Sequence, residues 1–267
     1  MRTLAPLFLA AAAVAFAAAP DAAEIVKKSV AANEANWKKA PDYAFTERDA
    51  EMKRGGAKIV KTKRVLMIEG YPYEQIVAIN DKPLAAEQKA QEDKKLKDEI
   101  ARRSHESAGD RARHIAKYQK ERQQDHALMR EMGNAFDFRI EGEDSLNGHE
   151  VYVISATPKA GYKPKMRDAK VLTGMRGKLW IDKKQYQWVK VQAEVVQPVT
   201  FGGFIAKVGP GTKFTLEQAP VGTGLWLPTH FSVNVNSSVL WRQSVTSDEE
   251  TYTHYEPMSR QLARVKE

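Results

Sequence analysis

The chain has 267 residues, which is long enough for one large β-rich domain or two small ones with a sizeable buried core. It contains no cysteine, so disulfides, thiolate metal sites and cysteine nucleophiles are excluded. The formal net charge is +8, and a basic surface can meet nucleic acid, anionic lipid or an acidic partner.

The N-terminus has the organisation of a secretory signal peptide. Arg2 supplies the charged start, residues 4–16 form an apolar run, and 17–19 are small residues suited to cleavage. The apolar run is short for a membrane anchor, and Pro20 and Asp21 follow it. We therefore expect residues 1–19 to be a signal peptide and 20–267 to form one domain in the periplasm. Export argues against nucleic acid as a partner, and we expect no stable membrane insertion.

A helix and then strands are predicted after the leader. Apolar residues recur at helical spacing over residues 21–39, and Pro41 ends that helix. Runs with strand character follow at 43–47, 58–69 and 73–80.

Residues 82–134 are predicted to be a helical insert. Pro83 after polar residues is typical of a helix start, and 84–104 is rich in good helix formers. A break follows, and Asp110 is the predicted N-cap of a second helix that runs to Met132. Neither helix has enough apolar surface to form a domain alone, so each must lie over another part of the chain.

The second half of the chain is a series of short strands separated by turns. The turn signals include Gly222-Thr223-Gly224 and Asn236-Ser237-Ser238. Together with the earlier strands, this pattern predicts about eleven antiparallel strands. The fold class is therefore mainly β with α, an open sheet with an N-terminal helix and a two-helix insert.

No arrangement of residues predicts catalysis or metal binding. The six histidines lack the spacing of zinc peptidases, and neither a Gly-x-Ser-x-Gly elbow nor a Ser-x-x-Lys motif is present. We expect no enzyme activity, no metal and no cofactor. A hydrolase acting on a lipid or glycan is the alternative, supported only by unassigned polar residues on the sheet. These residues are Glu143, Glu194, His230 and Asn234.

One face of several strands is apolar, and an unclosed barrel can be lined by such a face without being filled. A lining of this kind holds a hydrophobic ligand. The second insert helix adds a thin apolar stripe that is predicted to lie over the same face as a lid. The predicted ligand-binding residues of the sheet are Val189, Val191, Val195, Leu227, Phe231, Val233 and Val235. Those of the lid are Ile115, Tyr118, Met129 and Met132.

Two segments resemble the LolA/LolB-like family of periplasmic outer-membrane lipoprotein carriers. They are residues 146–154 with the exit at Pro158-Lys159, and residues 177–186 followed by a valine-rich strand, in an exported chain without cysteine. The resemblance implies an unclosed antiparallel half-barrel with a helical lid. It also implies a carrier that binds lipoprotein acyl chains or another amphiphile in a concave groove and delivers it to the outer membrane.

An envelope sensor or interaction protein is the other reading, because the same family includes a regulatory sensor. The charged insert would then dock on a protein partner or an anionic membrane surface. Acidic residues are interleaved with its cations, which favours salt bridges within the helix instead. We expect a monomer in either case.

Overall fold

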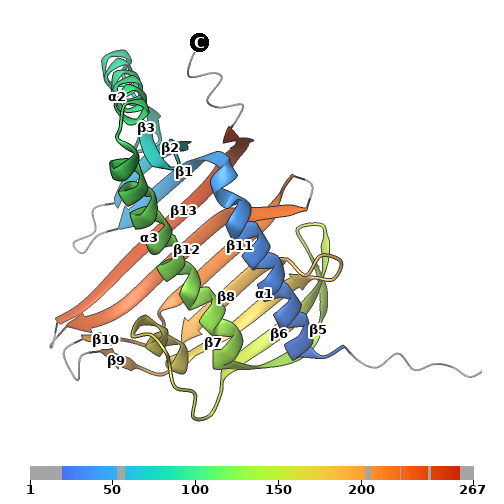
Figure 1. Cartoon of the computed structure of the whole chain (residues 1–267). Helices are drawn as coiled ribbons and strands as arrows, with labels where there is room; N and C mark the ends of the chain where they lie inside the picture. The colour runs from blue at the N-terminus through green and yellow to red at the C-terminus, as the bar shows by residue number, and fades with distance from the viewer. Residues whose placement is uncertain (1–19, 53–57, 202–205, 223, 240–241, 259–267) are drawn as a thin grey trace, which may run out of the picture.

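The computed structural model describes residues 20–52, 58–201, 206–222, 224–239 and 242–258 (Figure 1). The predicted signal peptide, residues 1–19, lies outside the described residues.

One antiparallel sheet of 13 strands is the frame of the molecule. Its order is β4-β3-β2-β1-β13-β12-β11-β8-β7-β6-β5, with β10 on β12 and β9 on β10. The strands span Tyr43–Met52, Lys58–Ile68, Tyr71–Ile79, Lys82–Pro83, Phe136–Leu146, His149–Pro158, Met175–Asp182, Trp188–Val195, Val199–Phe201, Ala206–Val208, Lys213–Gly222, Leu225–Val239 and Arg242–Pro257, as β1 to β13. The end strands β4 and β5 form no ladder with each other among the described residues, so the sheet is not closed.

The helices cover one face of this sheet for much of its width. α1 (Ala22–Lys39) and α3 (Ala108–Ala135) run across the strands on the same side, and α2 (Ala86–Ser104) projects from the β3 edge (Figure 1). Two short 3-10 helices, η1 (Ala40–Asp42) and η2 (Asp168–Gly174), complete the chain. The predicted mainly β half-barrel with an N-terminal helix and a two-helix insert is confirmed. The strand count exceeds eleven because β4 is very short and 199–208 contributes two strands.

The boundaries of α3 differ from the prediction. Ser107 is the N-cap, because its hydroxyl accepts the backbone N–H of Asp110 at 3.1 Å, and Asp110 lies in the first turn. The helix also continues past Met132 to Ala135, which is fully buried against the sheet. Burial of that last turn outweighs the weak helix preference of Gly133 and Asn134.

The turn predicted at Asn236-Ser237-Ser238 is wrong. Those residues lie inside β12, which pairs with β13 as far as Val239 and Arg242. Asn236 instead bonds to the turn at residues 209–211. Its carbonyl accepts the Gly209 N–H at 2.7 Å, and its side-chain amide donates to the Pro210 carbonyl at 3.0 Å. Its polar side chain therefore signals contact with a neighbouring turn and not a turn of its own.

The main core lies between the β5–β8 part of the sheet and α1. Ile25 and Val26 of α1 are buried against it together with Trp188 and Leu179. The Trp188 indole N–H also donates to the Ser29 hydroxyl at 3.0 Å, which fixes the helix on the strand. A smaller core under α2 contains Ala44, Leu66, Ile68 and Leu96.

Candidate ligand-binding site

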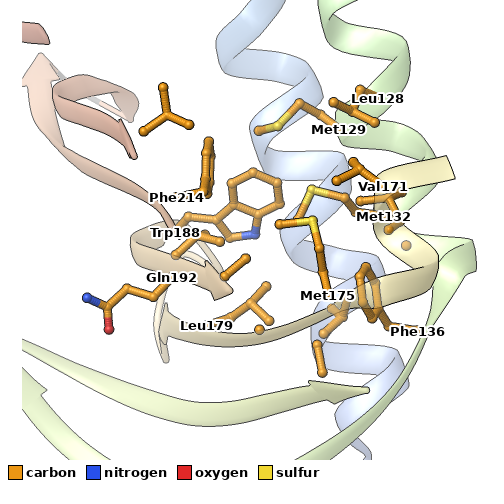
Figure 2. Close-up of a pocket in the computed structure, with 18 of the residues that line it drawn as sticks. Leu128, Met129, Met132, Phe136, Val171, Met175, Leu179, Trp188, Gln192 and Phe214 are labelled. Atoms are coloured by element: carbon orange, nitrogen blue, oxygen red, sulfur yellow. The ribbon is translucent and has the colours of Figure 1, made fainter. Parts of the chain in front are cut away.

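Two adjoining cavities lie between the helices and the covered face of the sheet. The first, here called the apolar cavity, has a volume of about 280 Å³ and a lining in which hydrophobic side chains predominate. Figure 2 shows side chains converging on it, with α1 and α3 behind and Trp188 near the centre. Its lining is Val26, Val30, Leu128, Met129, Met132, Gly133, Phe136, Phe138, Ala156, Val171, Leu172, Met175, Gly177, Leu179, Trp188, Val191, Gln192, Ala193, Val208, Thr212, Phe214, Val233 and Val235.

Regular secondary structure aims these side chains at one place. Met129 and Met132 are three residues apart on α3 and therefore lie on one face of the helix. Val233 and Val235 alternate along β12, so both point to the same side of the sheet. The amide group of Gln192 is turned away from the other lining residues (Figure 2). The cavity consequently offers a ligand a hydrocarbon surface.

Methionine is prominent around the apolar cavity. Met129 and Met132 come from α3, and Met175 faces them from β7 (Figure 2). An unbranched, polarisable side chain adapts to irregular shapes, so this lining can follow hydrocarbon chains of different form.

The second cavity, here called the polar cavity, has a volume of about 600 Å³. Val30, Met129, Trp188 and Phe214 line both cavities, so the two lie side by side along the sheet. The remaining residues of its lining mix polar and apolar types. They are Asn33, Asn36, Trp37, Ala40, His126, Arg130, Leu216, Gln218, Trp226, Leu227, Pro228, Phe231, Glu250 and Tyr252.

An acidic strip continues from the polar cavity across the same face of the sheet. Glu250 pairs with Phe231 on one side and with Asp49 on the other, and directly opposed residues share a face. By the same register Asp248 lies beside Val233, and Glu47 beside Tyr252. The acidic strip is defined as Glu47, Asp49, Asp248 and Glu250.

Burial and mutual repulsion raise the pKa of two carboxyl groups of the acidic strip. Burial raises the pKa of the Glu47 carboxyl, although Lys63 lies 3.2 Å away. Burial, then repulsion from Glu250 and Asp49, raises the pKa of Asp248. This part of the covered face is therefore unfavourable for an anion.

α3 is tied to α1 by a polar junction beside the polar cavity. The His126 imidazole contacts the Glu34 carboxylate and stacks on Trp37 with ring centroids 4.4 Å apart. The Arg122 guanidinium lies 4.4 Å from the Trp37 ring centroid and donates to the Trp37 carbonyl. The hydrogen bond from His126 lowers the pKa of Glu34, which is the signature of a favourable contact with the ionised acid.

Seven of the predicted ligand-binding residues lie on the two cavities. Met129, Met132, Val191, Val233 and Val235 line the apolar cavity. Leu227 and Phe231 line the polar cavity, which Met129 also reaches.

The other four predicted residues lie elsewhere. Val195 is buried in the main core, and Val189 packs with Val151 and Trp226 in a separate cluster. Ile115 approaches Gly70 at the β2–β3 turn, where its Cδ1 is 3.0 Å from the position of a Cβ on that glycine. Tyr118 is half-buried with the Arg122 guanidinium 5.5 Å from its ring centroid.

Sequence reasoning missed the contributions of α1, β5 and β7 to the cavities. Val26 and Val30 belong to the apolar stripe of α1, which was used only to predict the helix. Asn33 and Asn36 interrupt that stripe at positions that face the polar cavity, and this interruption was the available signal.

The polar residues considered for hydrolysis are spread over the sheet. His230 lies 3.4 Å from Glu249, and Glu143 pairs with Lys183. Lys213 of β11 lies between Asn234 and Glu194 in register. No group of three or more histidine and acidic side chains suited to a metal ion occurs in the part of the chain that the structure describes. None of the described helices has the length and apolar character needed to cross a membrane.

The cations of the insert are largely engaged by acids of the same helix. In α2, Lys89 pairs with Asp93, Lys94 with Asp98, Lys95 with Glu92 and Arg102 with Glu99. The predicted salt-bridged, solvated face is therefore present, which leaves less free positive charge for a partner.

The fold and the cavities define a half-barrel with a helix-covered, hydrophobic cavity. No protein-family model and no curated protein sequence matches the chain. Solved structures do match. A putative outer membrane lipoprotein-sorting protein domain from Vibrio parahaemolyticus has 12% identity and a TM-score of 0.34, covering 86% of this chain and 92% of that one.

Two further matches have similar values. A LolA superfamily protein from Nitrosomonas europaea has 11% identity and a TM-score of 0.33, covering 89% and 94% of the two chains. A DUF1329 family protein from Desulfovibrio piger has 12% identity and a TM-score of 0.35, covering 88% and 92%. The family that the sequence resembles is thus among the matches. At such low TM-scores the likeness carries no argument about a ligand, and the site rests on its own geometry.

Proposed function

We propose that this protein is a periplasmic carrier that binds the acyl chain of a lipoprotein or of another amphiphile and delivers it within the envelope. The observation that carries the proposal is the apolar cavity, which is lined by hydrocarbon and methionine side chains from both the sheet and α3. Burial of a hydrocarbon chain there removes apolar surface from water, at roughly 25 cal/mol per Å². Binding needs no covalent step.

The proposal includes the setting of this carrier. Residues 20–267 would form the mature chain, acting as a monomer and without a cofactor. A protein partner in the envelope would receive the ligand.

Blocking the apolar cavity tests the proposal. Val235→Trp places a bulky ring in the cavity, whereas Asn234→Trp places it on the opposite, exposed face of β12. We expect wild type and Asn234→Trp to bind a fluorescent dodecanoyl probe saturably, and Val235→Trp to bind it at least about tenfold more weakly, a loss of about 1.4 kcal/mol.

Circular dichroism should show both variants folded. Equal binding by the two variants, or no saturable binding by the wild type, would contradict the proposal.

A further inference from the structure

Exposed cations gather in the segment that joins β6 to β7. None of them has an ion-pair partner among the described residues, in contrast to the paired lysines of α2. The cations, here called the basic rim, are Lys159, Lys163, Lys165, Arg167, Lys170 and Arg176. Residues 159–176 contain these six cations and one acid, Asp168, so they carry +5 of the formal net charge of +8. A surface of this charge is complementary to an anionic partner.

The fold collects the basic rim at one end of the molecule. Ala156 of β6 pairs with Gly177 of β7, so the segment leaves and re-enters the sheet at the same end of two neighbouring strands. The Lys159 N–H donates to the carbonyl of the last residue of α3 at 2.9 Å. The Tyr162 hydroxyl donates to the Glu131 carboxylate at 2.6 Å. The segment is thereby held beside the C-terminal end of α3 (Figure 1).

The same segment forms part of the wall of the apolar cavity. Val171, Leu172 and Met175 line that cavity. Leu172 is only 4% exposed, whereas Lys170, two residues earlier, is exposed. The segment therefore presents apolar side chains to the cavity and basic side chains to the solvent. The basic rim is the outer surface of this part of the cavity wall.

Charge is distributed unevenly along the sheet. The acidic strip lies on β1 and β13, and in the strand order β12, β11 and β8 separate β13 from β7. An anionic surface would attract the basic rim and repel the acidic strip, so both forces turn the same end of the molecule toward it. The charge distribution thus selects one orientation, in which this wall of the apolar cavity meets the anionic surface.

The chemistry of the basic rim favours a lipid surface over an acidic protein. Four of its six cations are lysines, which are point charges on flexible stems and impose no fixed geometry on a partner. A fluid bilayer offers anionic head groups wherever such cations lie. A hydrocarbon chain that leaves the apolar cavity must also enter another apolar phase, and a bilayer supplies one below its head groups.

We propose that the basic rim docks the protein reversibly on an anionic lipid bilayer, with this wall of the apolar cavity facing the head groups. The inference rests on the proposed function, because docking places the cavity where its hydrocarbon ligand enters or leaves. Each cation close to such a surface strengthens binding by about fivefold. Docking of this kind is peripheral and needs no insertion of the chain into the hydrocarbon layer.

Co-sedimentation with vesicles tests the docking. The wild type is mixed with vesicles of phosphatidylcholine alone, or with vesicles in which roughly a third of the lipid is phosphatidylglycerol, at about 0.05 M and about 0.5 M NaCl. We expect binding to the anionic vesicles to be at least about tenfold tighter at low salt, since several cations act together. Most of that difference should be lost at high salt, because the ions screen the surface charge.

A matched pair of variants locates the effect. Each variant replaces the same number of exposed lysines by glutamine, so both have the same net charge, and α2 lies at the opposite end of the molecule from the basic rim (Figure 1). The rim variant combines Lys159→Gln, Lys163→Gln, Lys165→Gln and Lys170→Gln, and the α2 variant combines Lys89→Gln, Lys94→Gln, Lys95→Gln and Lys97→Gln. We expect affinity for the anionic vesicles to fall at least about tenfold in the rim variant and less than about threefold in the α2 variant.

Binding of the dodecanoyl probe separates the two proposals. Both variants should keep the wild-type affinity for the probe, because none of the substituted lysines lines either cavity. If the wild type docks on anionic vesicles but binds no probe, the proposed function fails. If it binds the probe but does not distinguish the two kinds of vesicle, or if both variants lose vesicle binding equally, only the docking is overturned, and an acidic protein becomes the counterpart of the basic rim. The wild-type comparison needs no variant, so the inference is testable even if a variant does not fold.

Discussion

Asp248 lies on the cavity side of β13, where β12 presents Val233 to one side of it and β1 presents Glu51 to the other. Its Oδ1 is buried without a hydrogen-bond partner in the described part of the chain. Burial, followed by repulsion from Glu250 and Asp49, raises its pKa above the ordinary value of 3.8. The ionised form of this residue therefore opposes folding.

The pH dependence follows from this direction. A carboxyl whose pKa is higher in the folded state than in the unfolded state binds its proton more tightly in the native protein. Its contribution to stability is therefore lost as the pH rises from the unfolded-state pKa through the folded-state pKa. We expect Asp248→Asn to raise the free energy of unfolding at pH 7 by about 0.5 kcal/mol, the order of a cross-strand pair. The gain should vanish below about pH 4, where the aspartate is neutral.

Urea denaturation at pH 7 and at low pH measures this effect. Glu249→Gln is the control, because Glu249 is exposed on the other face of β13 beside His230. A gain in both variants, or none in Asp248→Asn, would contradict the account of the acidic strip.

At the scale of single elements, α2 depends on one buried arginine. The Arg103 guanidinium donates to the carbonyls of Ile68 at 3.0 Å, Tyr71 at 2.7 Å and Pro72 at 3.1 Å. It also pairs with Glu99 at 2.6 Å. Hydrogen bonds from Arg102 and Arg103 lower the pKa of Glu99 to about 2. Since α2 has few apolar residues, this contact holds the helix on the β2–β3 turn.

Replacing Arg103 should release α2. Arg103→Met leaves three carbonyls without their donor and removes one of the two arginines that bond Glu99, and we expect a loss of about 3 kcal/mol in the free energy of unfolding. The Arg102 side chain is half exposed, so water screens its pairs with Glu99 and Glu106, and Arg102→Met should cost about 0.5 kcal/mol. Chemical denaturation of both variants provides the comparison, and equal losses would show that Arg103 does not anchor the helix.

The strand faces were predictable where alternation is unbroken. Val233 and Val235 follow period two along β12, and both line the apolar cavity as expected. The alternation fails in β8, where a register shift opposite Trp180 and Ile181 puts Trp188 and Val191 on the same cavity. Val189 is thereby moved to another cluster. A bulge depends on pairing between strands, so a single-strand pattern does not contain it.

The predicted lid residues extend from Ile115 to Met132, but only those near the C-terminal end of α3 line a cavity. α3 has 28 residues, which is roughly 42 Å at 1.5 Å per residue. One cavity cannot occupy its whole length. Met129 and Met132 near its end line the apolar cavity, whereas Arg111 near its start pairs with Glu69 at 3.1 Å beside the β2–β3 turn. The sequence pattern marks the apolar side of a helix but not its position along the sheet.

At the scale of the whole molecule, a ligand can enter the apolar cavity only if the covering helices move or the opening is already wide enough. Met129 and Met132 of α3 line the apolar cavity beside Leu128 and Gly133. At the junction with α1, His126 is buried, whereas Glu34, Trp37 and Arg122 are half-buried. Segments with sparse apolar contacts open at low free-energy cost. The long ladders of β12 with β11 and β13 must break before that strand exchanges its amide protons.

Hydrogen exchange distinguishes a mobile lid from a fixed cover. We expect the backbone amides of residues 110–132 to exchange faster than those of 225–235, and to slow when the dodecanoyl probe binds, because the ligand adds apolar contacts to Met129 and Met132. Residues 86–104 are the internal control: no residue of α2 lines either cavity, so their exchange should not respond to the ligand. Equal protection of 110–132 and 225–235, unchanged by ligand, would show that α3 is a fixed cover and that the ligand enters by another route.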